Sequence, residues 1–268
     1  MKSRFPRACA SLIVAFVSLP VFAQQDKNFW MENDRASVNI GGFAADFETE
    51  LRLSSRTLGI GTKINLEDDL GMESDRLLAR IDGYYRFSRR HRVDYSLLDV
   101  SRSGSIPVLR DIQVGDLFIP AGTPVKSEFK MAVLKAAYTY SFFQTRKVDL
   151  GASAGVTGLY VDTDLAAGVI GTEDAEGFAP YPIFGLRLSY AFSRKLFLKA
   201  SVDYFEIEEG DVEARVLDGL IALEHKTWKN VGLGGGYNAV DLEGENTEDN
   251  DEGAFEYKGL LLYAKIYF

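Results

Sequence analysis

The chain has almost none of the residues that carry thiol or imidazole chemistry. It contains one cysteine and two histidines in 268 residues. The cysteine, Cys9, lies close to the N-terminus, so the remainder of the chain can form no disulfide and carries no reactive thiol. Histidine is the usual general base near neutral pH, so this kind of catalysis would rest on His91 or His225.

Long apolar runs are absent beyond the N-terminus. Three basic residues stand within the first seven positions, an apolar stretch covers 8–19, and Val21-Phe22-Ala23 forms a small-x-small cleavage pattern. The apolar stretch is shorter than the roughly 20 residues that a membrane helix needs. We therefore predict that residues 1–23 are a cleaved signal peptide, with 24–36 a short periplasmic segment after it.

Basic charge is also scarce. The chain has 30 Lys and Arg against 39 Asp and Glu, and the first 23 residues hold three of the basic residues and none of the acidic ones. The mature chain therefore carries 27 minus 39, or −12. Binding to phosphate backbones needs a basic face, so we expect no nucleic acid partner.

Alternating apolar and polar residues, separated by turns, fill the rest of the chain. Four short turns are rich in basic and aromatic residues, at 86–91, 143–147, 192–195 and 226–230. The alternation predicts ten strands, near 37–54, 75–87, 92–103, 125–142, 147–161, 181–192, 195–207, 213–226, 230–242 and 254–268. Each is long enough to cross a membrane, which takes about 9–11 residues in a tilted strand. Eight strands is the alternative, if the first hairpin is not part of the wall.

One face of these strands is apolar and the other carries charges of both signs. Lipid offers charges no partner and forbids open sheet edges, which favours a closed barrel with an apolar exterior. We predict an all-β, transmembrane, antiparallel up-and-down barrel over 37–268. Its lumen charge network is predicted to include Arg80, Asp82, Arg86, Lys130, Arg187, Lys199, Asp203 and Lys258.

Strand parity places both termini and the four short turns at the periplasmic end. The long connections, at 55–74, 104–124, 162–180 and 243–253, then lie outside, which is typical of outer-membrane barrels. Residues 111–125 can form a small hairpin there. In the first strand, the apolar phase changes at Gly41-Gly42, which we interpret as a β-bulge.

The last ten residues, GLLLYAKIYF, end in an aromatic residue and alternate in polarity. They resemble the C-terminal signal of bacterial outer-membrane proteins, which the barrel-assembly machinery reads. The signal positions are Leu260, Leu262, Ala264, Ile266 and Phe268. The mature chain as a whole resembles the small, monomeric outer-membrane barrels of eight to ten strands. The resemblance implies a Gram-negative outer membrane with its lipid and lipopolysaccharide, but no particular activity.

Such barrels include structural anchors, adhesins, narrow channels, lipid hydrolases and proteases. The barrel-type lipid A deacylases pair His-x-Ser, whereas His225 is followed at that spacing by Thr227. Omptin-type proteases carry acidic pairs and a His-Asp couple near the outer rim, whereas His91 and His225 are both expected at the periplasmic end. We therefore predict no enzymatic activity.

Two acidic stretches, 65–75 and 241–252, are the candidates for cation binding. Calcium needs several oxygen ligands, but neither stretch has the 12-residue pattern of a calcium loop. The Gly-rich stretches at 151–158 and 232–236 lie within expected strands and precede no helix, so they are not phosphate loops. We expect no cofactor and no specific metal.

About eight strands leave a barrel interior filled by side chains, whereas wide pores have about 16. We therefore predict a non-enzymatic barrel with a structural or surface-interaction role and a largely plugged lumen. A narrow, porin-like solute channel is the main alternative, and a lipid hydrolase or protease at the rim is a further one.

Overall fold

The computed structural model describes residues 34–52, 54, 61–114, 117–168, 170–248 and 250–268. The predicted signal peptide and most of the predicted N-terminal segment lie outside these residues. In the part of the chain that is described, no helix is long and apolar enough to cross a membrane.

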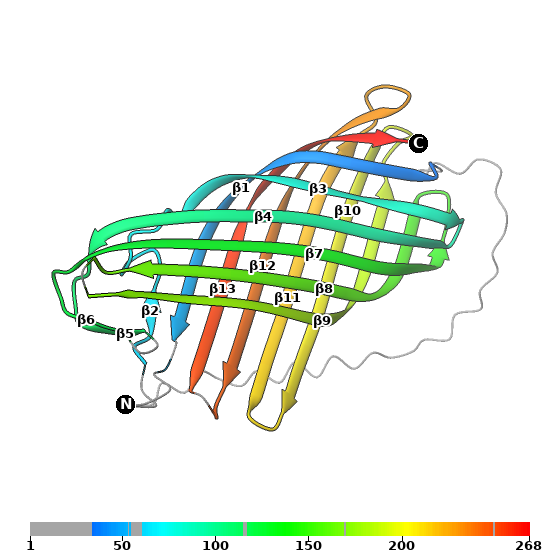
Figure 1. Ribbon diagram of the computed structural model, residues 1–268. Helices are drawn as coiled ribbons and strands as arrows, with labels where there is room; N and C mark the ends of the chain where they lie inside the picture. Colours follow the sequence, from blue (N-terminus) through cyan, green and yellow to red (C-terminus); the bar gives the residue numbers. More distant parts are fainter. Residues whose placement is uncertain (1–33, 53, 55–60, 115–116, 169, 249) are drawn as a thin grey trace.

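Ten long antiparallel strands form a closed barrel (Figure 1). They are β1 (Ala36–Arg52), β3 (Asp75–Ser88), β4 (His91–Pro107), β7 (Pro124–Gln144), β8 (Val148–Ala166), β9 (Thr172–Ala191), β10 (Leu196–Glu209), β11 (Val212–His225), β12 (Val231–Asn246) and β13 (Asp251–Tyr267). Pairing between β1 and β13 closes the wall, from Ser37 opposite Tyr267 to Arg52 opposite Glu252. The ten-strand prediction is confirmed. The eight-strand alternative is wrong because β1 pairs with wall strands on both sides.

Three short strands accompany the wall. The two-residue strand β2 (Ile64–Asn65) pairs with the end of β1. Strands β5 (Ile112–Val114) and β6 (Leu117–Ile119) form a separate hairpin, as predicted for 111–125.

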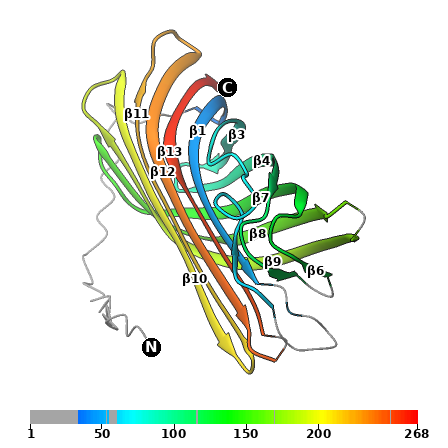
Figure 2. The ribbon, with the colours of Figure 1, turned by 90° about the vertical axis from the view of Figure 1, so that its left-hand side faces the viewer.

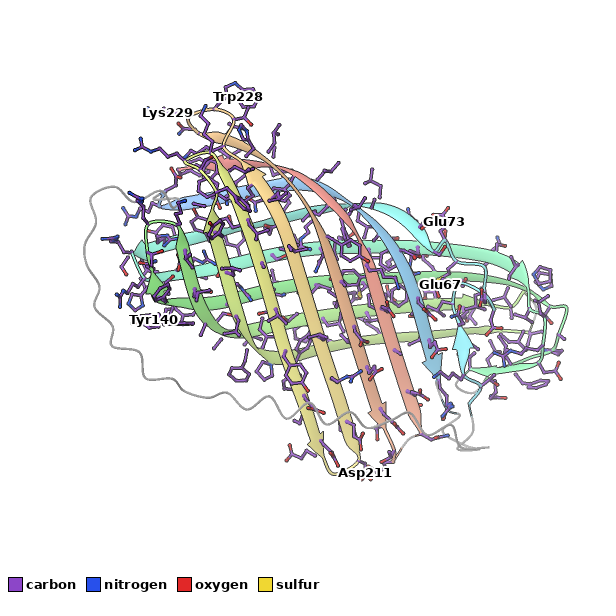
Figure 3. All side chains as sticks on the ribbon, turned by 180° about the vertical axis from the view of Figure 1, so that it is seen from behind. Glu67, Glu73, Tyr140, Asp211, Trp228 and Lys229 are labelled. Carbon is purple, nitrogen blue, oxygen red and sulfur yellow. The ribbon has the colours of Figure 1, made fainter. Side chains whose placement is uncertain are left out.

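The two ends of the barrel differ in their connections. One end, here called the turn end, carries the four short connections at 89–90, 145–147, 192–195 and 226–230, together with Phe268. The opposite end, here called the loop end, carries β2 and the β5–β6 hairpin. Figure 3 shows Trp228 and Lys229 at the turn end and Asp211 at the loop end.

The strands are longer at the loop end than predicted. Strand β8 continues to Ala166 and β9 begins at Thr172, so most of the predicted connection at 162–180 is strand. The predicted connections at 104–124 and 243–253 are shortened in the same way. These segments were missed because their apolar residues lie on the face opposite to the one that is apolar near the turns.

Most wall strands invert their polarity partway along their length. On β1, Ile40 lies on the outer face and is 54% exposed, whereas Phe43 and Phe47 face the interior and are buried. Further toward the loop end, the outer face of β1 carries Asp46 and Glu48. We call the half of the barrel nearer the turn end the turn half, and the other half the loop half. The apolar outer face of the turn half is here called the apolar band.

This inversion explains the phase change at Gly41-Gly42. Both ladders of β1 run through these glycines without a shift in register. The predicted β-bulge is therefore wrong, because the apolar residues move from the outer face to the inner face of a regular strand.

The wall splits into two sheets toward the loop end. The β3–β4 ladder stops at Arg80 opposite Leu98, and the β9–β10 ladder stops at Phe184 opposite Tyr204. Beyond these pairs, β4, β7, β8 and β9 form one sheet, and β10 to β13 with β1 and β3 form the other. Figures 1 and 2 show the two sheets running apart.

Segment 66–72 fills the split between β3 and β4. Leu66 and Leu70 are fully buried, and the amide of Met72 donates to the carbonyl of Leu66 at 3.0 Å. A side chain at Gly104 on β4 would overlap the carbonyl oxygen of Leu70, so glycine is required for this close approach. Ile112 and Ile119 of the β5–β6 hairpin are also buried, which gives the loop half an apolar core inside the wall.

The apolar band makes a direct prediction about substitutions on one face of β11. Ile221→Arg places a charge within the band and should lower the free energy of unfolding by about 2–4 kcal/mol in lipid vesicles. Glu213→Arg, on the same face but at the exposed loop end, should change it by at most about 1 kcal/mol. Denaturant titration of both variants checks this, and equal losses would contradict the assignment of the band.

Candidate functional site

The barrel interior is the candidate site, and it has two layers. In the turn half, inward-facing side chains are mostly charged or polar, whereas in the loop half they are mostly apolar. This follows from the period of two, because an apolar outer face leaves the charged residues of the same segment pointing inward.

Asp203 on β10 organises one part of the charged layer. It is 3% exposed, and it lies 2.9 Å from Nζ of Lys135 on β7 and 2.7 Å from Nη2 of Arg187 on β9. Lys135 also pairs with Asp218 on β11. Because β7 is a neighbour of neither β10 nor β11, the Lys135 side chain crosses the lumen.

Arg80 on β3 provides a second link across the lumen. Its Nη1 donates to Oδ1 of Asn238 on β12 at 2.6 Å, and its Nε lies 3.3 Å from Asp82. Asn238 in turn donates to Asp218 at 2.8 Å. A continuous polar chain therefore runs from β3 through β12 and β11 to Lys135 on β7.

Glu224 on β11 is the centre of a third cluster, nearer the turns. It accepts hydrogen bonds from the hydroxyl of Tyr263 at 2.8 Å and from Nζ of Lys265 at 2.9 Å. Nζ of Lys199 lies 3.9 Å away. The ring of Tyr263 occupies the space that a side chain at position 234 would need, so Gly234 makes room for it.

The structure places six of the eight predicted network residues on the inner face. These are Arg80, Asp82, Arg86, Arg187, Lys199 and Asp203. Lys130 and Lys258 lie on the outer face instead, where they pair with Glu128 at 3.2 Å and Glu256 at 2.8 Å. Both share the parity of the exposed apolar residues on their strands, so period two directs them outward.

The inner layer of the loop half was missed by the sequence reasoning. Aromatic rings meet there, with Phe43 and Tyr257 at 5.7 Å and Phe129 and Phe255 at 6.0 Å between centroids. The change of apolar phase along β1 indicates this layer in the sequence, but it was interpreted as a β-bulge.

One buried cation lies within this apolar layer. The guanidinium of Arg102 donates to the hydroxyl of Thr49 at 2.7 Å and pairs with Glu67 of segment 66–72. It also lies over the rings of Phe47 and Phe129, at 4.6 and 5.1 Å from their centroids. These contacts tie the segment to both sheets, since Thr49 is on β1 and Arg102 is on β4.

At the loop end, Lys63 links the residues before β2 to β1 and β13, the two strands whose pairing closes the barrel. Its Nζ lies 2.7 Å from Glu50 on β1 and 2.9 Å from Glu252 on β13. Hydrogen bonds to these two carboxylates raise the pKa of Lys63 above its usual value. The ammonium therefore stays charged, and the contact stays formed, throughout the neutral pH range.

Both histidines lie at the turn end, beside the short connections. Nδ1 of His91 is 2.5 Å from the hydroxyl of Tyr138, and Nδ1 of His225 is 3.2 Å from Oγ1 of Thr227. Tyr140, next to His91, lies in the same region in Figure 3. Among the described residues, no three His, Cys, Asp or Glu side chains are grouped so that they could hold a metal ion.

The five residues of the predicted C-terminal signal all lie on the outer face. Leu260, Leu262, Ala264, Ile266 and Phe268 are exposed there, while Leu261, Tyr263 and Tyr267 between them are buried. The carbonyl of Phe268 accepts hydrogen bonds from the amides of Arg35 and Ala36, at 2.8 and 3.2 Å.

The charged layer predicts a large contrast between two substitutions. Asp203→Ala leaves Lys135 and Arg187 buried without their shared carboxylate, which should cost about 3–5 kcal/mol of unfolding free energy. Lys258→Ala removes only an exposed pair and should cost at most about 1 kcal/mol. Equilibrium unfolding in vesicles measures both, and similar costs would show that the interior pairs are solvated like surface pairs.

The fold is shared with solved outer-membrane barrels. The outer membrane protease OmpT from Escherichia coli has a TM-score of 0.51 and 12% identity, covering 87% of this chain and 96% of that one. Neisserial surface protein A matches with a TM-score of 0.38 and 13% identity, covering 87% and 97%. The toluene transporter TodX from Pseudomonas putida matches with a TM-score of 0.38 and 8% identity, covering 89% and 91%.

No family model matches the sequence, and no curated protein does. The similarity to OmpT shows the architecture of a small outer-membrane barrel, and at 12% identity it shows the fold alone. The role of this chain therefore has to be argued from its own interior and surface.

Proposed function

We propose that the protein is a non-enzymatic outer-membrane barrel with a structural or surface-interaction role, whose lumen is plugged by charged side chains. The observation that carries the proposal is the polar chain across the lumen, from Arg80 through Asn238 and Asp218 to Lys135. Its members are held by strands on opposite walls, and such a chain obstructs the path along the barrel axis.

The apolar band supports a location in the membrane with the loop half outside. Exposed aromatic residues gather at the turn end, among them Phe87, Phe142, Phe192 and Trp228, as expected for a membrane interface. In this proposal both termini face the periplasm, and the outward residues from Leu260 to Phe268 are read there by the barrel-assembly machinery. The chain acts as a monomer.

The surface-interaction role rests on the loop half. Its outer face carries many carboxylates, including Glu48, Glu128, Asp162 and Glu176, and it extends beyond the apolar band. Lipopolysaccharide, which is itself anionic, would approach such a surface through divalent cations rather than by direct pairing. The absence of enzymatic activity rests on the position of His91 and His225 at the turn end, far from this surface.

A narrow channel is the second candidate, and one observation favours it. A cavity of about 150 Å³ lies within the charged layer, lined by Arg80, Lys135, Arg187 and Glu224 among others. This volume can hold several water molecules, at roughly 30 Å³ each. It would become a path for small ions if the cross-lumen side chains moved aside.

Conductance in planar lipid bilayers tests the plug. The native protein should show no steady ion conductance, whereas Arg80→Ala combined with Lys135→Ala should show clear conductance steps, because both side chains span the lumen. Lys130→Ala with Lys258→Ala is the matched control, since these lysines are on the outer face. Steady conductance by the native protein, unchanged in the Arg80/Lys135 variant, would contradict the plug and support the channel.

A further inference from the structure

The split between β9 and β10 differs from the split between β3 and β4. Segment 66–72 fills the split between β3 and β4, and its Leu66 and Leu70 are fully buried. At the split between β9 and β10, pairing stops at Phe184 opposite Tyr204, and residues 176–180 of β9 are exposed on both faces. We call the space between 178–182 of β9 and 205–209 of β10 the lateral slot.

The sequence of β9 prevents the slot from closing by strand pairing. The amide of Ala191 donates to Lys147, on the β8 side, and the amide of Phe192 donates to Leu196 of β10. Amide directions alternate along a strand, so even-numbered positions of β9 face β10. Pro180 and Pro182 are two of these positions, and their nitrogens carry no hydrogen to donate.

The facing edge of β10 is also unsuited to pairing. The same alternation turns the amides of Glu206 and Glu208 toward the slot, and both side chains are exposed. Charged residues and proline on strand edges prevent the addition of another strand. The edges are therefore built to stay apart, rather than to recruit a strand from another chain.

The floor of the slot is formed by two aromatic rings that face the interior. Tyr181 of β9 and Phe205 of β10 stack with centroids 5.8 Å apart and planes at 22°. Behind Tyr181 lies a mainly apolar cavity, lined by Leu159, Ile183 and Val216 among others and bordered by Lys135, Asp203 and Asp218 of the charged layer. Its free space is only about 30 Å³, roughly that of one water molecule, so any longer occupant must displace the two rings.

The outer mouth of the slot adjoins the apolar band. Phe178 and Phe184, above and below the two prolines on the outer face of β9, are 69% and 62% exposed. The β10 side of the mouth carries Glu206 and Glu208, and Glu176 lies above Phe178 on β9. Hydrocarbon thus adjoins the mouth from the β9 side and from the band below, and anionic head groups are disfavoured beside these carboxylates.

From this geometry, we propose that the lateral slot binds one hydrocarbon chain of a membrane lipid. The chain enters between β9 and β10 from the apolar band and lies against Tyr181 and Phe205. The bound hydrocarbon chain covers apolar wall surface that strand pairing leaves open, so the favourable free energy of binding comes from burial of Phe205 and Ile207. The cavity behind the two rings borders the charged layer, but binding in the slot does not require ion flow through the lumen.

Photo-crosslinking in vesicles of phosphatidylcholine tests the proposal. A small fraction of the lipid carries a diazirine at the end of one acyl chain, and mass spectrometry locates the labelled residues. We expect label on the inward-facing Tyr181, Phe205 or Ile207, in addition to lipid-facing residues such as Phe184. The same chain on phosphatidylglycerol should label the inward-facing residues less, because of the carboxylates beside the mouth.

The double variant Pro180→Val with Pro182→Val restores two amide donors facing β10. It should reduce labelling of the inward-facing residues several-fold and leave Phe184 labelled as before. Pro124→Val, at the start of β7 and away from the slot, is the matched control and should change neither. Label confined to lipid-facing residues in the native protein, or inward label unchanged in the double variant, would overturn the proposal.

A second variant keeps the test decisive if the double variant does not fold, as judged by heat-modifiable gel migration. Tyr181→Ala removes one ring from the floor of the slot. Labelling should then reach Ile183 and Val216 in the cavity behind it. Failure to gain this label would also overturn the proposal.

Discussion

The absence of any partner for charge in hydrocarbon is the constraint on which the rest of the structure depends. It allows only apolar side chains on the outer face of the turn half, from Ile40 to Ala44 on β1 and from Leu260 to Ile266 on β13. Since side chains alternate, the charges of these segments must enter the lumen, where they need one another. Asp203 and Glu224 each serve more than one cation for this reason.

Above the band, the outer face meets water instead of lipid. The alternation of side chains then places the apolar residues inside the barrel and the charged residues outside. The outer face becomes charged, and the interior becomes an apolar core with Arg102 and Glu67 as a buried pair. Open sheet edges are tolerated in water but not in lipid. The wall can therefore split only toward the loop end. One split is filled by segment 66–72, and the other begins at the upper edge of the band.

Strand number and turn positions could be predicted from the sequence, because the turn halves alternate regularly and basic turns separate them. The loop halves of the strands could not be predicted, because their apolar residues lie on the inner face instead of the outer face, as Phe43 and Phe47 do. The inner face was predicted correctly for residues such as Arg80 and Asp203, which lie in the regularly alternating parts of their strands. The pairing of Lys135 with Asp218 depends on which walls face each other, and a local pattern does not contain that information.

The inversion of polarity is tested most directly by cysteine labelling along the outer face of β13. Cys9 lies in the predicted signal peptide, so each introduced cysteine would be the only one in the mature chain. Cysteines at Glu256 and Lys258 should react rapidly with a membrane-impermeant maleimide in intact vesicles, whereas cysteines at Leu260 and Leu262 should be protected. Uniform reactivity across these four positions would contradict the account.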